Sequence, residues 1–170
     1  ASGILNDTWE WDGVQWTNVT PAGATPPLLS RSAMVFDVAR NAVLLFGGTG
    51  TFADSDQTWL FDGVRWSRLM TSTVPPALDG PALAHDGLRG RTVLFGGYSR
   101  PGSSLSQETW ELTATDWVRL ASPTSPFARS RAVACFDWAR RRVFMFGGSR
   151  FGTAQTDGWE WDGVTWSLVP

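Results

Sequence analysis

The sequence predicts an all-β fold in which four-stranded sheets repeat as the blades of a β-propeller. Four pairs of Trp recur along the 170 residues; six residues separate the members of each pair, and the first members are 50, 51 and 49 positions apart. Each interval between pairs contains one Phe-Gly-Gly. A period near fifty residues, built from short apolar runs and turn residues, is typical of one blade. The repeated residues are Trp9, Trp16, Trp59, Trp66, Trp110, Trp117, Trp159 and Trp166, together with Gly47, Gly48, Gly96, Gly97, Gly147 and Gly148.

One complete repeat predicts four strands. Residues 32–36 and 42–46 are short apolar runs, so we expect two buried strands joined by a polar turn. Gly47 and Gly48 end the second run, and glycine permits the positive φ and the close backbone approach expected there. Residues 58–61 alternate as a third strand, and an Asp-Gly turn leads to the fourth at residues 66–69.

The repeats divide the chain into one half-blade and three blades of a single propeller domain. Residues 1–20 hold only a third and a fourth strand, at 8–11 and 15–19, and residues 21–70, 71–120 and 121–170 each hold a full blade. Propellers close with about four to eight blades, so the fourteen strands predict exposed edges.

There are two alternatives for how the ring is completed. Either further blades come from a longer chain, or copies of this chain associate. The octapeptides at 9–16 and 159–166 differ at one position, which indicates that the two ends are equivalent positions of the repeat. We expect self-association or further blades as the partner.

The repeat resembles the kelch motif. A Gly-Gly pair closes the second strand, an aromatic residue stands on the third strand, and a Trp follows seven residues later, where the kelch family often has Tyr. The resemblance covers the whole chain and implies a kelch-type propeller. Kelch propellers serve as adaptor, ligand-binding and, with added ligands, oxidase domains, so the resemblance implies an architecture more strongly than a function.

Antiparallel alternation places the long loops 49–57, 98–108 and 149–157 on one face, together with the connectors between blades. Long irregular loops on a rigid scaffold are where binding usually occurs. By the kelch resemblance the first strand is innermost, so the Ser-Arg pairs before two of these strands would line the rim of the channel. The middle repeat has Asp79-Gly80 there, which predicts a mixed-charge pocket. The candidate binding residues are Ser30, Arg31, Tyr98, Arg100, Ser130, Arg131 and Arg150.

Several charged residues on this face could have a structural role instead of binding a ligand. Arg31 and Arg131 are suited to an acidic group, and equally to a bridge between adjacent blades. Asp54 and Asp56 have the spacing of a calcium loop, but no Glu follows at the required distance, so we expect solvated carboxylates.

The lone His and Cys are expected to be structural. His85 replaces the Phe of the neighbouring repeats and predicts a core or turn-edge position, and Cys135 aligns with small apolar residues and predicts a buried side chain. One His predicts no metal site. Trp11 and Trp161 align with apolar residues, which favours the core over a platform for stacking sugars.

The composition argues against several function classes. The net charge is −2 and all 14 basic residues are Arg, so no basic field favours nucleic acid. No stretch reaches the roughly 20 apolar residues of a membrane helix, so we expect no membrane partner. One His, one Cys and one Tyr supply no evident nucleophile and base, and we expect no cofactor.

Three functions remain open. We favour a non-catalytic propeller that binds a protein or a small ligand through its loop-rich face. The second is a carbohydrate-binding or carbohydrate-active propeller, favoured only by the abundance of Trp. The third is an engineered or excised repeat segment whose activity is self-assembly.

Overall fold

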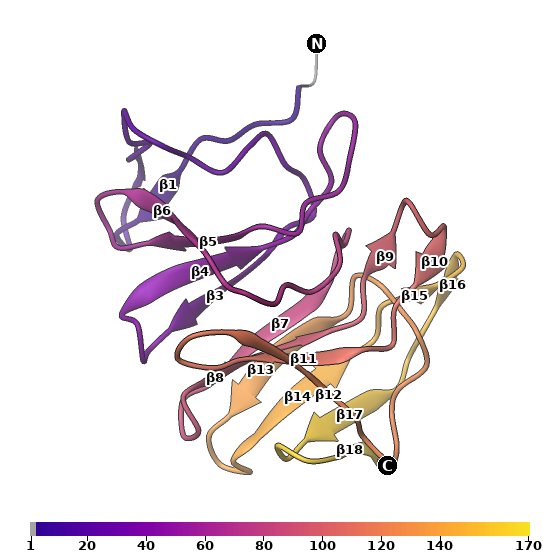
Figure 1. Cartoon of the computed structure of the whole chain (residues 1–170). Helices are drawn as coiled ribbons and strands as arrows, with labels where there is room; N and C mark the ends of the chain where they lie inside the picture. Colours follow the sequence, from indigo (N-terminus) through magenta and orange to yellow (C-terminus); the bar gives the residue numbers. More distant parts are fainter. Residues whose placement is uncertain (1–2) are drawn as a thin grey trace.

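The computed structural model describes residues 3–170 and confirms the all-β prediction. It contains three four-stranded antiparallel sheets and three two-stranded sheets. Figure 1 shows the larger sheets following one another from the N-terminal part, at the upper left, to the C-terminal part below it. Within the described range no helix is long and apolar enough to cross a membrane.

The first sheet has the strand order of the sequence: β3 (Ala33–Asp37), β4 (Ala42–Phe46), β5 (Thr58–Phe61) and β6 (Trp66–Leu69). The predicted third and fourth strands are confirmed at their predicted bounds. Gly47 follows β4 with a φ of 70°, which confirms the expected positive φ.

The second sheet repeats this order with β7 (Ala82–Asp86), β8 (Arg91–Phe95), β11 (Thr109–Leu112) and β12 (Trp117–Leu120). Its last turn lacks Asp-Gly. The Thr113 hydroxyl accepts the backbone N–H of Asp116 at 3.0 Å, so a Thr side chain closes this turn instead.

The third sheet consists of β13 (Val133–Asp137), β14 (Arg142–Phe146), β17 (Gly158–Trp161) and β18 (Trp166–Val169). Its strands pair as in the other two sheets, with Phe144 opposite both Cys135 and Glu160. Opposite residues of a sheet project from the same face. These three side chains therefore share one face.

The predicted half-blade is a two-stranded sheet of β1 (Trp9–Trp11) and β2 (Trp16–Asn18). Both strands are shorter than the 8–11 and 15–19 expected. The pairing continues through a backbone hydrogen bond of 2.9 Å from Val19 to Thr8, so Thr8 lies in line with the strand that follows it.

Two of the three long loops differ from the prediction of irregular structure. Residues 98–108 contain a hairpin of β9 (Tyr98–Ser99) and β10 (Ser104–Leu105), and residues 149–157 contain one of β15 (Ser149–Arg150) and β16 (Thr153–Ala154). With these four short strands, residues 3–170 contain eighteen strands rather than fourteen.

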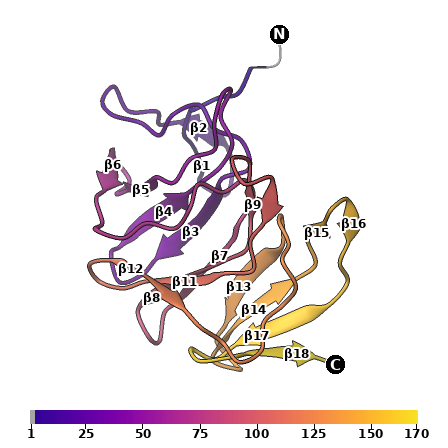
Figure 2. The same cartoon turned by 45° about the vertical axis from the view of Figure 1, so that its right-hand side comes forward.

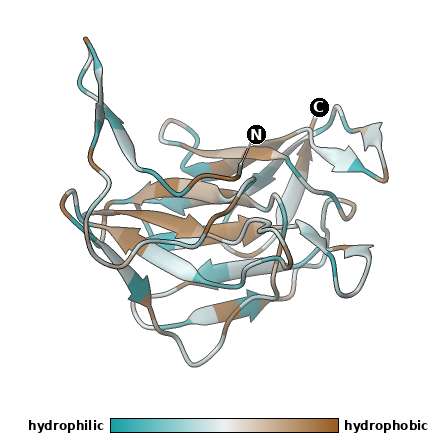
Figure 3. Cartoon of the chain, turned by 90° about the horizontal axis from the view of Figure 1, so that it is seen from above, coloured by the Kyte–Doolittle hydropathy of each residue, from teal (hydrophilic) through white to brown (hydrophobic). Residues whose placement is uncertain are grey.

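Successive sheets pack face to face, as in Figure 3, where hydrophobic residues are concentrated on strands in the middle of the molecule. We call the side that carries the fourth-strand Trp the Trp face, and the side that carries Thr58 or Thr109 the Thr face. The Trp face of the second sheet packs on the Thr face of the first, through Trp117 against Leu44 and Phe46. The third sheet packs in the same way on the second, with Trp166 against Phe95.

A hydrogen bond recurs at each of these contacts. Trp117 donates its Nε1–H to Thr58 Oγ1 at 3.0 Å, and Trp166 donates to Thr109 Oγ1 at 2.9 Å. Trp66 donates to Thr8 Oγ1 at 2.8 Å, which ties the first sheet to the β1–β2 sheet. Large aromatic groups therefore fill the space between sheets while their polar atoms remain paired.

The first strands of the three larger sheets lie side by side, with β7 between β3 and β13 (Figure 2). All five residues of β7 are buried, whereas β3 and β13 have one exposed face and one face that is mostly half-buried. The expectation that every first strand is buried is therefore wrong for the two outer sheets, because each has a larger sheet on only one side.

The same cause corrects the expected burial of Cys135 and of Trp11. Cys135 is exposed, because it lies on the face of the third sheet that no other sheet covers. Trp9, Trp11 and Trp16 are exposed on the uncovered side of the β1–β2 sheet. Trp161 is buried as expected, since the second sheet covers it.

Candidate functional site

The predicted rim residues are fixed by short backbone pairings with the loops. Ser30 pairs with Thr49, Asp79 with Tyr98, and Ser130 with Ser149. Each pairing joins the residue that precedes a first strand to the segment that follows the Gly-Gly pair. The connectors and long loops therefore lie on one side of the sheets, as the alternation of strands predicted.

The next residue along the chain has left-handed backbone in all three repeats. Arg31, Gly80 and Arg131 have φ values of 57°, 61° and 59°. Gly80 donates its N–H to Arg31 O at 3.1 Å, and Arg131 donates to Gly80 O at 2.6 Å. Left-handed backbone costs a non-glycine residue about 1–2 kcal/mol, so two of the three repeats retain Arg despite a conformational penalty.

The two Arg side chains converge on one carboxylate. Arg31 Nη1 lies 2.7 Å from Asp79 Oδ2, and Arg131 Nη2 lies 3.9 Å from the same oxygen. The Asp79 side chain is 8% exposed, whereas the Arg side chains are 49% and 55% exposed. Asp79 Oδ1 is buried without a hydrogen-bond partner. The expected mixed-charge group is therefore assembled, with a buried carboxylate next to two guanidinium groups that are partly open to solvent.

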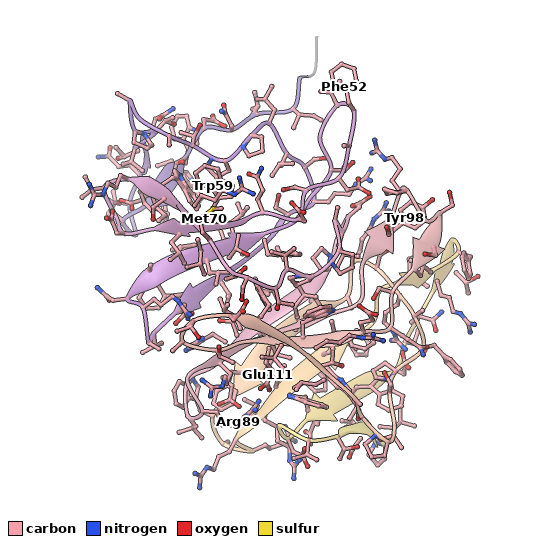
Figure 4. All side chains as sticks on the ribbon, in the orientation of Figure 1. Phe52, Trp59, Met70, Arg89, Tyr98 and Glu111 are labelled. Atoms are coloured by element: carbon pink, nitrogen blue, oxygen red, sulfur yellow. The ribbon has the colours of Figure 1, made fainter. Side chains whose placement is uncertain are left out.

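A pocket of about 460 Å³ opens at this group. The β9–β10 and β15–β16 hairpins both contribute to its wall, and Figure 4 shows Tyr98 at the start of the first of them. Three Arg and one Asp line the pocket, so its charge is predominantly positive. The lining residues are Arg31, Asp79, Tyr98, Arg100, Leu105, Ser130, Arg131, Ser149, Phe151 and Gly152.

Arg100 also lines the pocket but is already paired. Its backbone N–H donates to Asp54 Oδ2 at 2.9 Å, and its guanidinium lies 3.5 Å from Asp54 Oδ1 and donates to Thr49 Oγ1. The expectation that Asp54 is solvated is wrong, because this contact across two sheets buries its side chain. Asp56 is exposed, as expected.

Two other candidates lie at the margin of the pocket or beyond it. Ser30 is held beside Thr49 and does not line the pocket. The guanidinium of Arg150 lies 4.8 Å from the centre of the Phe127 ring, which is a cation–π contact, and Arg150 also lies outside the lining. The pocket therefore includes five of the seven predicted binding residues.

His85 is buried at the far ends of the first strands, which confirms its expected structural position. Its Nδ1 lies 3.0 Å from Thr92 Oγ1 and 3.6 Å from Asp37 Oδ1. Burial lowers the pKa of His85 below its ordinary value, although Asp37 and Asp86 oppose this shift. The imidazole is therefore held in its neutral form between the first and second sheets.

Sequence reasoning missed a buried ion pair next to the pocket. Arg129 is 1% exposed, and its Nη1 and Nη2 lie 2.5 and 2.8 Å from the two carboxylate oxygens of Asp157. These hydrogen bonds, helped by one from Trp159, lower the pKa of Asp157 to about 2. An Arg stands here where the other repeats have Leu29 and Leu78, and this mismatch was the available signal.

A second missed group lies between the second and third sheets. Glu111 is buried and accepts the Nε1–H of Trp161 at 3.0 Å, while Arg89 Nη1 lies 2.6 Å from the same carboxylate oxygen. Figure 4 shows Arg89 and Glu111 close together on the second sheet. The equivalent residues are Leu60 in the first sheet and Glu160 in the third, so the repeat pattern did not indicate whether a carboxylate at this position is buried.

In the part of the chain that the structure describes, no three His, Cys, Asp or Glu side chains gather as metal ligands would. No protein-family model and no curated protein matches this chain.

Proposed function

We propose that this chain is part of a kelch-type propeller that acts as a non-catalytic binding scaffold for an acidic group, held between Arg31 and Arg131. The observation that carries this proposal is the convergence of the two guanidinium groups on buried Asp79. Support for the propeller comes from the repeated sheets, their face-to-face packing and the side-by-side first strands.

The charge of the pocket favours an acidic ligand. Asp79 compensates at most one of the two facing Arg residues, and Asp54 already pairs with Arg100. A carboxylate between Arg31 and Arg131 would form charge-assisted hydrogen bonds, which are shorter and stronger than neutral ones. The guanidinium groups of Arg31 and Arg131 are about half exposed, so a carboxylate in the pocket can reach their N–H groups.

The backbone conformation supports binding over a purely structural role. Gly80 shows that glycine satisfies the left-handed position in one repeat. Arg at the other two positions adds strain that glycine would avoid, and strain of this kind is often retained at functional sites.

Binding rather than catalysis is also supported by the position of the one His. Ser130 and Ser149 line the pocket, but His85 lies at the opposite ends of the strands and cannot act as a base on their hydroxyl groups. The pocket is therefore suited to recognition through charge and hydrogen bonds.

The test is the affinity of a blocked tetraglutamate peptide, measured by calorimetry, against the matching tetraglutamine peptide. We expect only the acidic peptide to bind. Arg31→Gly combined with Arg131→Gly should weaken it by about tenfold or more, since a hydrogen bond to a charged group contributes about 1.5–3 kcal/mol. Arg65→Ala, on an exposed turn outside the pocket, is the control. Equal affinity of the double variant and the wild type would exclude this site.

A further inference from the structure

The contact between the second and third sheets has a specific polar arrangement. Glu111 of the second sheet accepts the indole N–H of Trp161, and Arg89 joins Glu111 to Asp86. Arg89 also lies against the next turn, since a Cβ on Gly163 would be 2.7 Å from Arg89 Nη1. Trp161 thereby becomes completely buried.

The third sheet carries the same Asp, Arg and Glu group on a side that no other sheet covers. Asp137, Arg140 and Glu160 occupy the positions of Asp86, Arg89 and Glu111, and they pair with one another at 2.8 and 3.7 Å. Arg140 is 66% exposed because no sheet covers it. We call this uncovered side the outer face of the third sheet; its apolar residues are Val133, Cys135, Phe144, Phe146 and Val169.

The β1–β2 sheet carries the matching Trp residues on an exposed face. Its octapeptide 9–16 matches 159–166 except that Gln15 replaces Thr165. Trp11 and Trp16 stack with their centroids 5.6 Å apart and a 44° angle, close to the 5.5 Å and 41° of the buried pair in the third sheet. They are 52% and 63% exposed. The Trp face of the β1–β2 sheet therefore has the same Trp arrangement as the Trp face of the third sheet, which packs on the second sheet within the chain.

We propose that a second copy of this chain docks head to tail, with the Trp face of its β1–β2 sheet on the outer face of the third sheet. In this complex Trp11 of one copy donates its indole N–H to Glu160 of the other, as Trp161 donates to Glu111 within one chain. Arg140 lies against the Gly13 turn, as Arg89 lies against Gly163. This surface contains none of the residues of the acidic-ligand pocket, so it is independent of that function.

One substitution makes the docked contact weaker than the internal ones. Thr58 and Thr109 accept an indole N–H from the next sheet, but the equivalent residue of the third sheet is Gly158. The ring of Phe144 lies over Gly158, 3.1 Å from where a Cβ would be. Trp16 therefore finds no hydroxyl there, and we expect association that depends on concentration.

The contact uses different surfaces on the two copies, so each copy keeps one free end. This gives a test by complementation. Trp11→Arg blocks one surface and Phe146→Arg the other, and both residues are already exposed, so little folding stability should be lost. Phe52→Arg, at an exposed loop tip visible in Figure 4, is the control.

We expect sedimentation velocity to show mass above the 18.6 kDa of one chain for the wild type and for Phe52→Arg, and one-chain mass for each blocking variant alone. An equimolar mixture of the two blocking variants should regain a complex of two chains and no larger species. A wild type that stays at one-chain mass, a mixture that stays dissociated, or a blocking variant that still associates alone would each overturn the proposal.

Cys135 provides a second readout that does not depend on variants of the outer face. It is the one Cys of the chain and lies on that face. Its rate of modification by a maleimide should fall as the protein concentration rises, and Trp11→Arg should restore the fast rate. A rate that is independent of concentration in associated wild-type protein would place the contact elsewhere.

Discussion

The backbone N–H of Arg131 donates to the carbonyl oxygen of Gly80 across 2.6 Å and joins the third sheet to the second at the pocket. The corresponding bond from Gly80 to Arg31 joins the second sheet to the first. The left-handed conformation of all three residues is therefore part of one chain of contacts. These two hydrogen bonds place Arg31 and Arg131 on either side of Asp79.

This arrangement predicts that Gly80→Ala greatly lowers the free energy of unfolding. The new Cβ would lie 2.8 Å from Arg131 Cγ, and Ala would have to adopt a φ of 61°. Gly90→Ala is the matched control, since Gly90 has a φ of 62° and the nearest atom to its new Cβ would be Ala39 Cβ at 3.9 Å. Strain alone should lower the unfolding free energy by about 1 kcal/mol at Gly90, and by more at Gly80, in urea unfolding. Equal costs would show that the close approach of Arg131 is unimportant.

The Trp-to-Thr hydrogen bonds predict a graded response to Thr→Val substitutions. Thr58→Val leaves the indole N–H of Trp117 unpaired in a buried place and should cost about 1–3 kcal/mol of unfolding free energy. Thr8→Val should cost less, because Thr8 is partly exposed and water can replace the hydroxyl for Trp66. Chemical denaturation of the two variants measures the difference, and a larger loss at Thr8 would contradict it.

Asp157 predicts a pH dependence of stability in acid. Its pKa is lowered from 3.8 to about 2 in the folded state, chiefly by Arg129. The unfolded state therefore binds the proton first, so the stabilisation is complete above 3.8 and is lost as the pH falls toward 2. Asp157→Asn should be less stable than wild type at neutral pH, and the difference should shrink through this window. Thermal melting at a series of pH values measures it; a constant difference would exclude the ion pair as its cause.

His85 predicts a second pH dependence in a higher range. Its folded pKa lies below the ordinary 6.5, so the unfolded state is protonated first as the pH falls through 6.5. Wild-type stability should therefore decrease below that pH. His85→Phe, which restores the residue of the other two repeats, should remove this decrease in melting curves recorded above and below pH 6.5. A variant with the same decrease as the wild type would assign it to other groups.

The sequence was sufficient to predict the strands of the four-stranded sheets, because period and turn residues are local properties of each repeat; it did not predict the two loop hairpins β9–β10 and β15–β16. β5 and β6 lie where the pattern of residues 58–69 placed them, and Gly47 has the positive φ expected. A mixed-charge group of Arg31, Arg131 and Asp79 was expected from the alignment of the repeats together with the kelch resemblance, whereas the contact of both guanidinium groups with one carboxylate was not.

Burial at the ends of the stack was not predictable in this way. Cys135 and Trp11 occupy apolar positions of the repeat, and their exposure depends on whether another sheet covers them. The burial of Asp54 by Arg100 depends on a contact between residues far apart in sequence, which no local pattern contains.

The binding site itself is tested most directly by nuclear magnetic resonance of the Arg side chains. The chain is titrated with the tetraglutamate peptide while the Nε–Hε signals of Arg31, Arg131 and Arg65 are followed. We predict that the signals of Arg31 and Arg131 shift together with one midpoint, while that of Arg65 stays in place. Binding that leaves both pocket signals unchanged, or no binding at all, would contradict the assignment of an acidic-ligand site between Arg31 and Arg131.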